Sequence, residues 1–283
     1  MSTWVFLRGL TREARHWGDF PATFRAAFAS ELGVGDILTP DLPGNGRRFA
    51  ESSPLRVEEM MEACRRELRE QGRPPPYHLL AFSLGAMVAV AWARRYPEEC
   101  RVAVLLNTSL RPHSPFHQRL RPGAWPALLR LLFASGLARE RAILELTCAR
   151  AEELAALLPQ WSIYASDCPV SRANALRQLL AATRFTALEK PDVPVLILSG
   201  MQDRMVDPRC SRQLARAWSC AYARHPDAGH DLPLDAGVWV AREVRDWLEK
   251  GAADKSWFVQ ESAANPTVAD KGGVQSLEVA RAE

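Results

Sequence analysis

Ser83 lies in the stretch LLAFSLGAM (residues 79–87), where a hydrophobic run ends at a serine with Ala81 and Gly85 on either side. The residues before it have the composition of a buried strand, and residues 85–98 have apolar side chains at helical spacing. A serine on a tight strand-to-helix turn presents its hydroxyl as a nucleophile, and small flanking residues are needed because larger ones collide with the neighbouring strand and helix. The simpler alternative is a serine that only caps the helix.

A candidate acid and a candidate base follow Ser83 along the chain, and their order supports a role for Ser83 as a nucleophile. A serine hydroxyl is a poor nucleophile at neutral pH and needs a base, which a carboxylate orients. Asp203 follows the hydrophobic run VPVLILSG (193–200), and His230 follows the next apolar run, CAYARHP (220–226). Because parallel strands end at one edge of a sheet, Ser83, Asp203 and His230 are expected to meet there.

Short apolar runs alternate with segments of helical period along most of the chain. Continuously hydrophobic strands separated by helices predict an α/β fold, a mostly parallel sheet with helices on both faces. Strands are predicted at 3–9, 36–44, 77–83, 101–109, 193–200 and 220–226, and helices at 18–32, 57–72, 85–98 and 238–251. The domain prediction is a core of residues 1–109 and 189–250, a helical cap of 110–188 and a disordered tail of 251–283.

The composition argues against several classes of protein. The 283 residues carry a net charge of +3 with basic residues spread along helices, which disfavours nucleic-acid binding. No apolar run reaches the roughly 18 residues of a membrane span, and the first residues lack a secretion signal, so we expect a cytoplasmic protein without a membrane span. The six scattered cysteines, without C-x-x-C pairing, are expected to be reduced thiols.

Five segments carry a resemblance to a known family. LRGL, DLPGNG, AFSLGAM, SGMQDRMVDP and AGHDLPLD resemble the α/β-hydrolase superfamily in their order along residues 2–250. Within it, the chain is similar to small cap-bearing serine esterases such as the pimeloyl-carrier-protein methyl ester esterases. The sequence departs from the family pattern at Ala81, where glycine is usual. The resemblance implies a catalytic triad of Ser83, Asp203 and His230.

The resemblance also implies an oxyanion hole. Its donors are the backbone amides of Leu84, after the nucleophile, and of Leu10, in the loop Arg8-Gly9-Leu10 after the first predicted strand. Arg8 stands where the family usually has histidine. Its guanidinium either braces the loop by hydrogen bonds or is a fixed cation that favours substrates with a nearby carboxylate or phosphate.

Other acids and histidines compete for the triad positions. Asp207 lies four residues after Asp203, but the G-x-x-D spacing of the family selects Asp203. His225 closes its strand, where packing or a local hydrogen bond is expected, whereas His230 lies in a loop. The loop acids Asp231 and Asp235 are expected to be solvated. The remaining histidines are expected to be ordinary surface or hydrogen-bonded residues, the last two with the alternative of facing substrate: His16, His78, His113 and His117.

The helical cap is expected to cover the active site, since ligands in this architecture bind at the C-terminal edge of the sheet. Candidate substrate-pocket residues, whose alternative role is packing onto the core, are Leu128, Leu129, Leu131, Leu132, Phe133, Trp161 and Tyr164. Several arginines are expected on solvated helix faces, and the resemblance implies as an alternative that they meet an acidic partner such as an acyl carrier protein: Arg119, Arg121, Arg130, Arg139 and Arg141.

These residues together predict a serine carboxylesterase. It would hydrolyse a small-molecule ester with a short- to medium-chain acyl group through an acyl-enzyme, and it would need no metal or organic cofactor. The alternatives on the same triad are an acyltransferase, a perhydrolase and a carbon–carbon bond hydrolase. A further alternative is a ligand-binding protein that has kept the fold and lost turnover.

Overall fold

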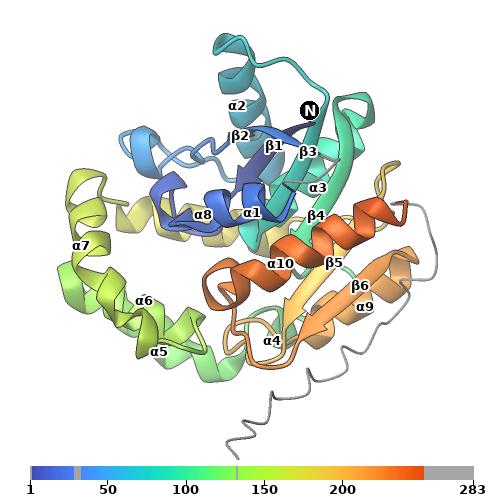
Figure 1. Cartoon of the computed structure of the whole chain (residues 1–283). Helices are drawn as coiled ribbons and strands as arrows, with labels where there is room; N and C mark the ends of the chain where they lie inside the picture. The colour runs from blue at the N-terminus through green and yellow to red at the C-terminus, as the bar shows by residue number, and fades with distance from the viewer. Residues whose placement is uncertain (1, 29–32, 132, 252–283) are drawn as a thin grey trace, which may run out of the picture.

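A parallel β-sheet forms the centre of the molecule in the computed structural model, which describes residues 2–28, 33–131 and 133–251 (Figure 1). The order across the sheet is β2-β1-β3-β4-β5-β6, and every pairing is parallel. The fold class predicted from the alternating pattern is confirmed. The strands are β1 (Ser2–Leu7), β2 (Val34–Leu38), β3 (Tyr77–Phe82), β4 (Cys100–Leu106), β5 (Val195–Gly200) and β6 (Ala221–His225).

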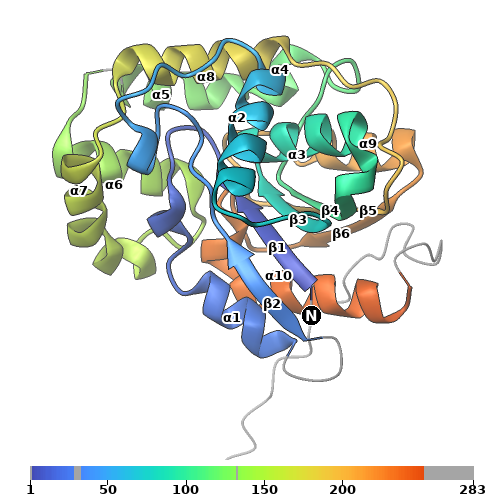
Figure 2. The ribbon, with the colours of Figure 1, turned by 90° about the horizontal axis from the view of Figure 1, so that it is seen from above.

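Helices cover both faces of this sheet, as Figure 2 shows. Successive side chains of a strand point to opposite faces, so Trp4 and Phe6 of β1 pack in one buried cluster and Val5 and Leu7 in the other. Both faces are therefore apolar, which is why the strands are continuously hydrophobic. The first cluster lies under α1 (Phe20–Ala27) and α10 (Leu232–Glu249), and the second lies under α2 (Val57–Glu70), α3 (Leu84–Arg95) and α9 (Arg209–Trp218).

A helical insertion, residues 110–188, separates β4 from β5 and lies over the edge at which the strands end (Figure 1). Its described residues form no strand longer than the isolated bridge between Arg111 and Thr186. No helix in the described part of the chain is long and apolar enough to cross a membrane. The helices of the insertion are α4 (Phe116–Arg119), α5 (Trp125–Leu131), α6 (Gly136–Thr147), α7 (Leu158–Asp167) and α8 (Arg172–Arg184).

The two terminal helices differ from their predicted bounds. The last one starts at Leu232 rather than at residue 238, because Pro233 is accommodated in its first turn, where a missing N–H costs nothing. A break in helical dihedrals at Ala236 (φ −145°, ψ 42°) separates this first turn from the amphipathic part that the sequence pattern detects. The first predicted helix, 18–32, is described as α1 only to Ala27, and the tail predicted at 251–283 lies outside the described residues apart from Gly251.

The direction in which successive strands are added to the sheet reverses at β1. It passes from β1 to β2 on one side and then to β3 on the other, which makes the carboxyl ends of β1 and β3 a topological switch point, the place where open α/β sheets bind ligands. Leu7 pairs with Ala81 in this register. The loop after β1, which contains Arg8 and Leu10, therefore lies beside the turn that carries Ser83.

Candidate active site

Ser83 occupies a strained turn between β3 and α3. Its dihedrals are φ 54° and ψ −115°, a conformation that non-glycine residues rarely adopt. Gly85 makes the turn feasible, since a Cβ there would lie 2.3 Å from the carbonyl oxygen of Leu7. Ser83 is the N-cap residue of α3, yet its side chain makes no capping hydrogen bond, so the helix-cap alternative does not account for this serine.

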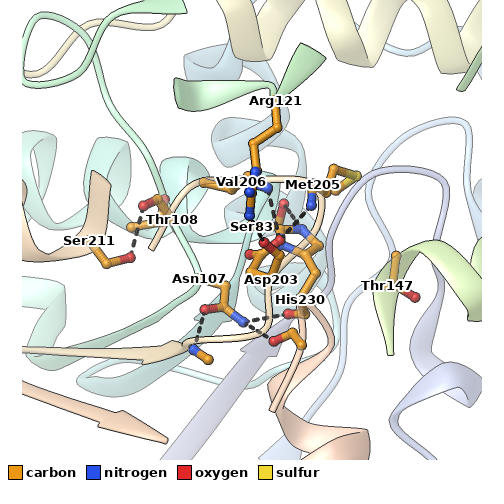
Figure 3. A network of polar contacts seen from close by, with 12 residues as sticks. Ser83, Asn107, Thr108, Arg121, Thr147, Asp203, Met205, Val206, Ser211 and His230 are labelled. Atoms are coloured by element: carbon orange, nitrogen blue, oxygen red, sulfur yellow. Dashed lines mark hydrogen bonds and ion pairs between the residues drawn. The ribbon is translucent and has the colours of Figure 1, made fainter. Parts of the chain in front are cut away.

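Three side chains from the ends of three strands meet at this turn (Figure 3). Ser83 Oγ lies 3.1 Å from His230 Nε2, and His230 Nδ1 lies 2.6 Å from Asp203 Oδ2. Asp203 and His230 are each 1% exposed. The carboxylate accepts the proton of Nδ1, which leaves Nε2 as an acceptor for the serine hydroxyl, the arrangement that a general base requires.

The Asp203 carboxylate is held by its own loop. Its Oδ1 accepts backbone hydrogen bonds from Met205 and Val206, both of 2.8 Å, which leaves Oδ2 directed at His230. Arg121 of the insertion donates to the carbonyl oxygen of Asp203 over 2.6 Å. These bonds fix the rotamer of the carboxylate and hence the orientation of the imidazole.

Asn107, at the end of β4, is a residue that sequence reasoning missed. Its Nδ2 donates to the carbonyl oxygens of Gly229 (2.9 Å) and His230 (2.6 Å), and its Oδ1 accepts from the amide of Gly200 (2.8 Å). Asn107 has φ 44°, which asparagine tolerates better than most residues. The available signal was its place directly after the run RVAVLL, at the same sheet edge as the triad. One buried amide thus ties the end of β5 to the loop of His230.

Arg8 braces the same loop from the other side. It forms a two-pronged ion pair with Asp231, with Nη1 to Oδ1 at 3.1 Å and Nη2 to Oδ2 at 2.5 Å. The guanidinium also lies over the rings of Trp17 and Phe82. Arg8 is absent from the described lining of the cavity that contains Ser83. The expectation that Asp231 is solvated is wrong, because this pair holds it 3% exposed next to His230.

Asp235 is also buried rather than solvated, which corrects a second expectation. Its Oδ2 accepts hydrogen bonds from the amides of Gly229 (2.7 Å) and of Ala149 (2.9 Å), the second of which belongs to the insertion. Burial raises the pKa of this carboxyl, and the backbone hydrogen bonds oppose that rise. Asp235 therefore links the His230 loop to the insertion, because both contribute amides to one carboxylate.

The competing acids and histidines have other partners. Asp207 pairs with Arg209 at 2.6 Å, and the ring of His225 packs 5.2 Å from Trp239. His16 is buried against the insertion, where burial and the charge of Arg12 lower its pKa well below the usual value. His113 and His117 are absent from the described lining of the cavity that holds Ser83.

The two expected oxyanion donors lie at the cavity that contains Ser83. Leu84 begins α3 and Leu10 follows Gly9, and both line the cavity that holds the serine. A Cβ on Gly9 would lie 2.9 Å from the Phe82 ring, so this glycine allows the loop to approach the turn. The insertion also holds this loop in place, because the amide of Thr11 donates to Gln178 Oε1 of α8 over 2.9 Å.

A cavity of about 890 Å³ opens over Ser83 and His230. Leu128, Leu129 and Leu131 of α5 belong to its mostly apolar lining, as the sequence predicts. Three other candidates lie elsewhere: Phe133 follows the end of α5 and is 75% exposed, whereas on α7 Trp161 is buried within the insertion and Tyr164 lines a second cavity of about 200 Å³. Leu132 lies outside the described residues.

The arginines of the insertion differ in their surroundings. Arg119 is 9% exposed rather than solvated, because its guanidinium donates to the carbonyl oxygens of Ala182 and Thr183 in the last turn of α8. Arg139 lines the cavity, which also departs from the expectation of a solvated face. The side chains that lie on exposed surface are those of Arg121, Arg130 and Arg141.

Comparisons with known proteins agree with this fold. A family model described as "Alpha/beta hydrolase family" matches residues 4–243. The chain is 27% identical over 74 residues to "Uncharacterized protein YbdG" of Bacillus subtilis (strain 168), a match that covers 26% of this chain and 23% of that protein. The enol-lactonase from Burkholderia xenovorans LB400 is similar in structure, with a TM-score of 0.69, 20% identity, and coverage of 88% of this chain and 91% of that one. A thermophilic esterase from Thermogutta terrifontis superposes with a TM-score of 0.65 at 20% identity, covering 88% of this chain and 90% of that one.

Proposed function

Because the chain belongs to the alpha/beta hydrolase family, we propose that it is a serine hydrolase that cleaves short- to medium-chain carboxylic esters through an acyl-enzyme. The observation that carries this proposal is the continuous chain of contacts from Ser83 Oγ to His230 Nε2 (3.1 Å) and from His230 Nδ1 to Asp203 Oδ2 (2.6 Å). The serine lies in a mostly apolar cavity whose lining includes Leu10 and Leu84, the two expected oxyanion donors.

Acylation begins with the serine hydroxyl. Ser83 Oγ attacks the ester carbonyl carbon while His230 Nε2 takes the hydroxyl proton. Asp203 stabilises the imidazolium that forms and keeps its Nδ1 proton in place. The amides of Leu10 and Leu84 donate to the oxyanion of the tetrahedral intermediate, a contribution for which loss of one donor typically costs about a hundredfold in rate. His230 then protonates the leaving alcohol.

Deacylation uses the same groups with water as the nucleophile. His230 removes a proton from a water molecule, which attacks the acyl carbonyl and releases the acid and the free serine. The N-terminus of α3 points at the same place, so its partial positive charge also favours the negative charge that develops in both steps.

The cavity supports medium-sized, largely apolar substrates. Its volume of about 890 Å³ lies within the range of roughly 300–1,000 Å³ that is usual for small-molecule sites. Leucines of α5 and aromatic side chains such as Phe116 and Trp125 contribute to its wall. Aliphatic acyl or alcohol groups are the chemistry that such a lining accommodates.

The test compares hydrolysis of p-nitrophenyl esters from acetate to decanoate by the wild type and by Ser83→Ala. Turnover by the wild type and its loss in Ser83→Ala are expected, together with labelling of Ser83 by a fluorophosphonate. Ser114→Ala is the matched control, because it removes a serine hydroxyl that donates to Gln213 away from the cavity lining. Turnover that survives in Ser83→Ala would overturn the proposal, and labelling of Ser83 without turnover of any ester would redirect it to acyl transfer or carbon–carbon bond cleavage.

A further inference from the structure

Arg12 lines the catalytic cavity and has one buried donor without a partner among the described residues. Its side chain is 7% exposed, with the guanidinium carbon 4.6 Å above the ring centre of Trp161. Nη1 donates to Glu140 Oε2 over 2.5 Å and lies 2.9 Å from His16 Nε2. Nη2 is buried and has no hydrogen-bond partner within the described residues. The guanidinium is thus held rigidly while one of its nitrogens remains unused.

Arg139 of α6 lies in the same wall with a second unused donor. Arg12 and Arg139 both line the catalytic cavity and the smaller cavity behind it. Arg139 Nη1 donates to the carbonyl oxygen of Val170 over 3.4 Å, whereas its Nε is buried without a partner in the described part of the chain. Burial lowers the pKa of Arg139, and the charges of Arg12 and Arg172 act in the same direction against the opposing effect of Glu140.

The charges in this wall do not balance. Arg172, which is exposed, also lines the catalytic cavity, so three guanidinium groups share one described carboxylate, that of Glu140. Glu140 lines only the smaller cavity, and Asp231, the acid in the described lining of the catalytic cavity, is neutralised by Arg8. Arg119 also lines the cavity and its Nε has no partner among the described residues, but both of its Nη atoms are taken up by carbonyl oxygens at the C-terminal end of α8. The cavity is therefore positively charged at one end and otherwise apolar. An anionic group of a ligand would balance this charge.

We propose that Arg12 and Arg139 form a carboxylate-binding subsite, so that the preferred ester carries a second, ionised carboxyl group. Each of these two guanidinium groups keeps one N–H donor without a partner among the described residues, and a planar guanidinium recognises a carboxylate well. The inference rests on the proposed function, since Ser83 and the subsite share one cavity. Arg8 does not fill this role, because both of its Nη atoms pair with Asp231 and it is absent from the described lining of the cavity, although its Nε also has no partner among the described residues.

The kinetic test uses monomethyl esters of linear dicarboxylic acids from succinate to suberate and the corresponding dimethyl esters. The ratio of kcat/KM for the mono- and dimethyl ester of each acid isolates the effect of the free carboxylate. We expect a ratio of about ten or more at one chain length in the wild type, and a fall of roughly tenfold to a hundredfold in Arg139→Gln, as for loss of a charge-assisted hydrogen bond. Equal ratios in the wild type and in Arg139→Gln would overturn the subsite.

The matched control is Arg141→Gln, which removes an exposed arginine from the same helix without touching the cavity lining. Its ratio is expected to equal that of the wild type, and a fall as large as that of Arg139→Gln would mean that the overall charge of the insertion, not the subsite, sets the preference. Arg12→Gln is compared by the same ratio after a thermal melt has shown that it folds.

A binding measurement separates this inference from the proposed function. Calorimetric titration of Ser83→Ala with adipate and with dimethyl adipate requires no turnover. Stronger binding of adipate, lost in Ser83→Ala/Arg139→Gln, supports the subsite even if no ester is hydrolysed. Equal or absent binding of adipate, together with ester turnover that shows no carboxylate preference, overturns the subsite and leaves the esterase proposal standing.

Discussion

Substitution of Asn107 provides a quantitative test of how the site is assembled. Its amide makes three buried hydrogen bonds, two to the carbonyl oxygens of Gly229 and His230 and one from the amide of Gly200. Asn107→Gly removes all three and keeps a backbone that tolerates φ 44°. Asn107→Ala removes the same bonds and adds the cost of a Cβ at positive φ. The pair of variants therefore separates hydrogen bonding from backbone strain.

The magnitude follows from the number of groups left without partners. The carbonyl oxygen of His230 keeps a hydrogen bond from the amide of Leu232, so the carbonyl of Gly229 and the amide of Gly200 are the two groups that lose their partner. At about 1–3 kcal/mol each, they predict a loss of roughly 2–6 kcal/mol in the free energy of unfolding for Asn107→Gly. Asn107→Ala is expected to lose about 1–2 kcal/mol more, because a left-handed conformation disfavours Cβ. Release of the His230 carbonyl also frees the loop, and displacement of a catalytic group by about 1 Å can cost a hundredfold in rate.

The assay is urea denaturation combined with kcat/KM on the best p-nitrophenyl ester. Ser211→Ala is the matched control, since it removes one nearby hydrogen bond, from Ser211 Oγ to the carbonyl oxygen of Thr108 (3.1 Å), without touching the His230 loop. We expect it to lose about 1 kcal/mol and to keep its activity. If Asn107→Gly unfolds within about 1 kcal/mol of the wild type and retains kcat/KM, Asn107 does not brace the site.

Two further predictions concern buried charges. Arg8→Gln leaves Asp231 buried without its counter-ion and should lower the free energy of unfolding by about 3–5 kcal/mol in urea denaturation, with Arg8→Gln/Asp231→Asn less destabilised than Arg8→Gln. Because the Arg8 charge is neutralised, kcat/KM of Arg8→Gln should fall equally on neutral and carboxylate-bearing esters, and a selective loss on the latter would contradict the pairing. Burial and the nearby charge of Arg101 lower the pKa of His78 to about 4 in the folded chain. In the unfolded chain the pKa is about 6.5, so between these two pH values His78 is protonated in the unfolded chain and neutral in the folded chain. Stability should therefore fall between pH 6.5 and 4, by up to about 3 kcal/mol from His78, and this fall should be smaller in His78→Phe; equal pH slopes would refute the role of His78.

The sequence predicted those features of the fold that have a local signature. Continuous apolar runs of strand length and segments of helical period each reflect the surfaces that one element buries, so the parallel sheet and its covering helices were predictable. The predicted helix bounds were wrong where the local sequence pattern gives no helical signal. The start of α10 at Leu232 is an example, because its first turn contains Pro233 and is separated from the amphipathic part by the break at Ala236.

The candidate site divides in the same way. Ser83, Asp203 and His230 follow hydrophobic runs at one sheet edge, so their chain order alone predicted that they meet. The lining of the cavity was less predictable, because a helix such as α7 presents Trp161 and Tyr164 to different surroundings only after it has packed. Leu128 and Leu129 were found because α5 lies directly over the cavity.

By itself, the sequence determined the alternation of strands and helices, the strained serine turn and the order of the three polar residues, since each depends on neighbours within a few positions. Only the tertiary structure decided that Arg8 neutralises Asp231, that Asn107 ties β5 to the His230 loop, and that Arg12 keeps a donor unused. The contacts of Arg8 and Asn107 join residues 93 to 223 positions apart. Whether a charged or amide group is solvated, paired or left unsatisfied therefore depends on which distant segment packs against it.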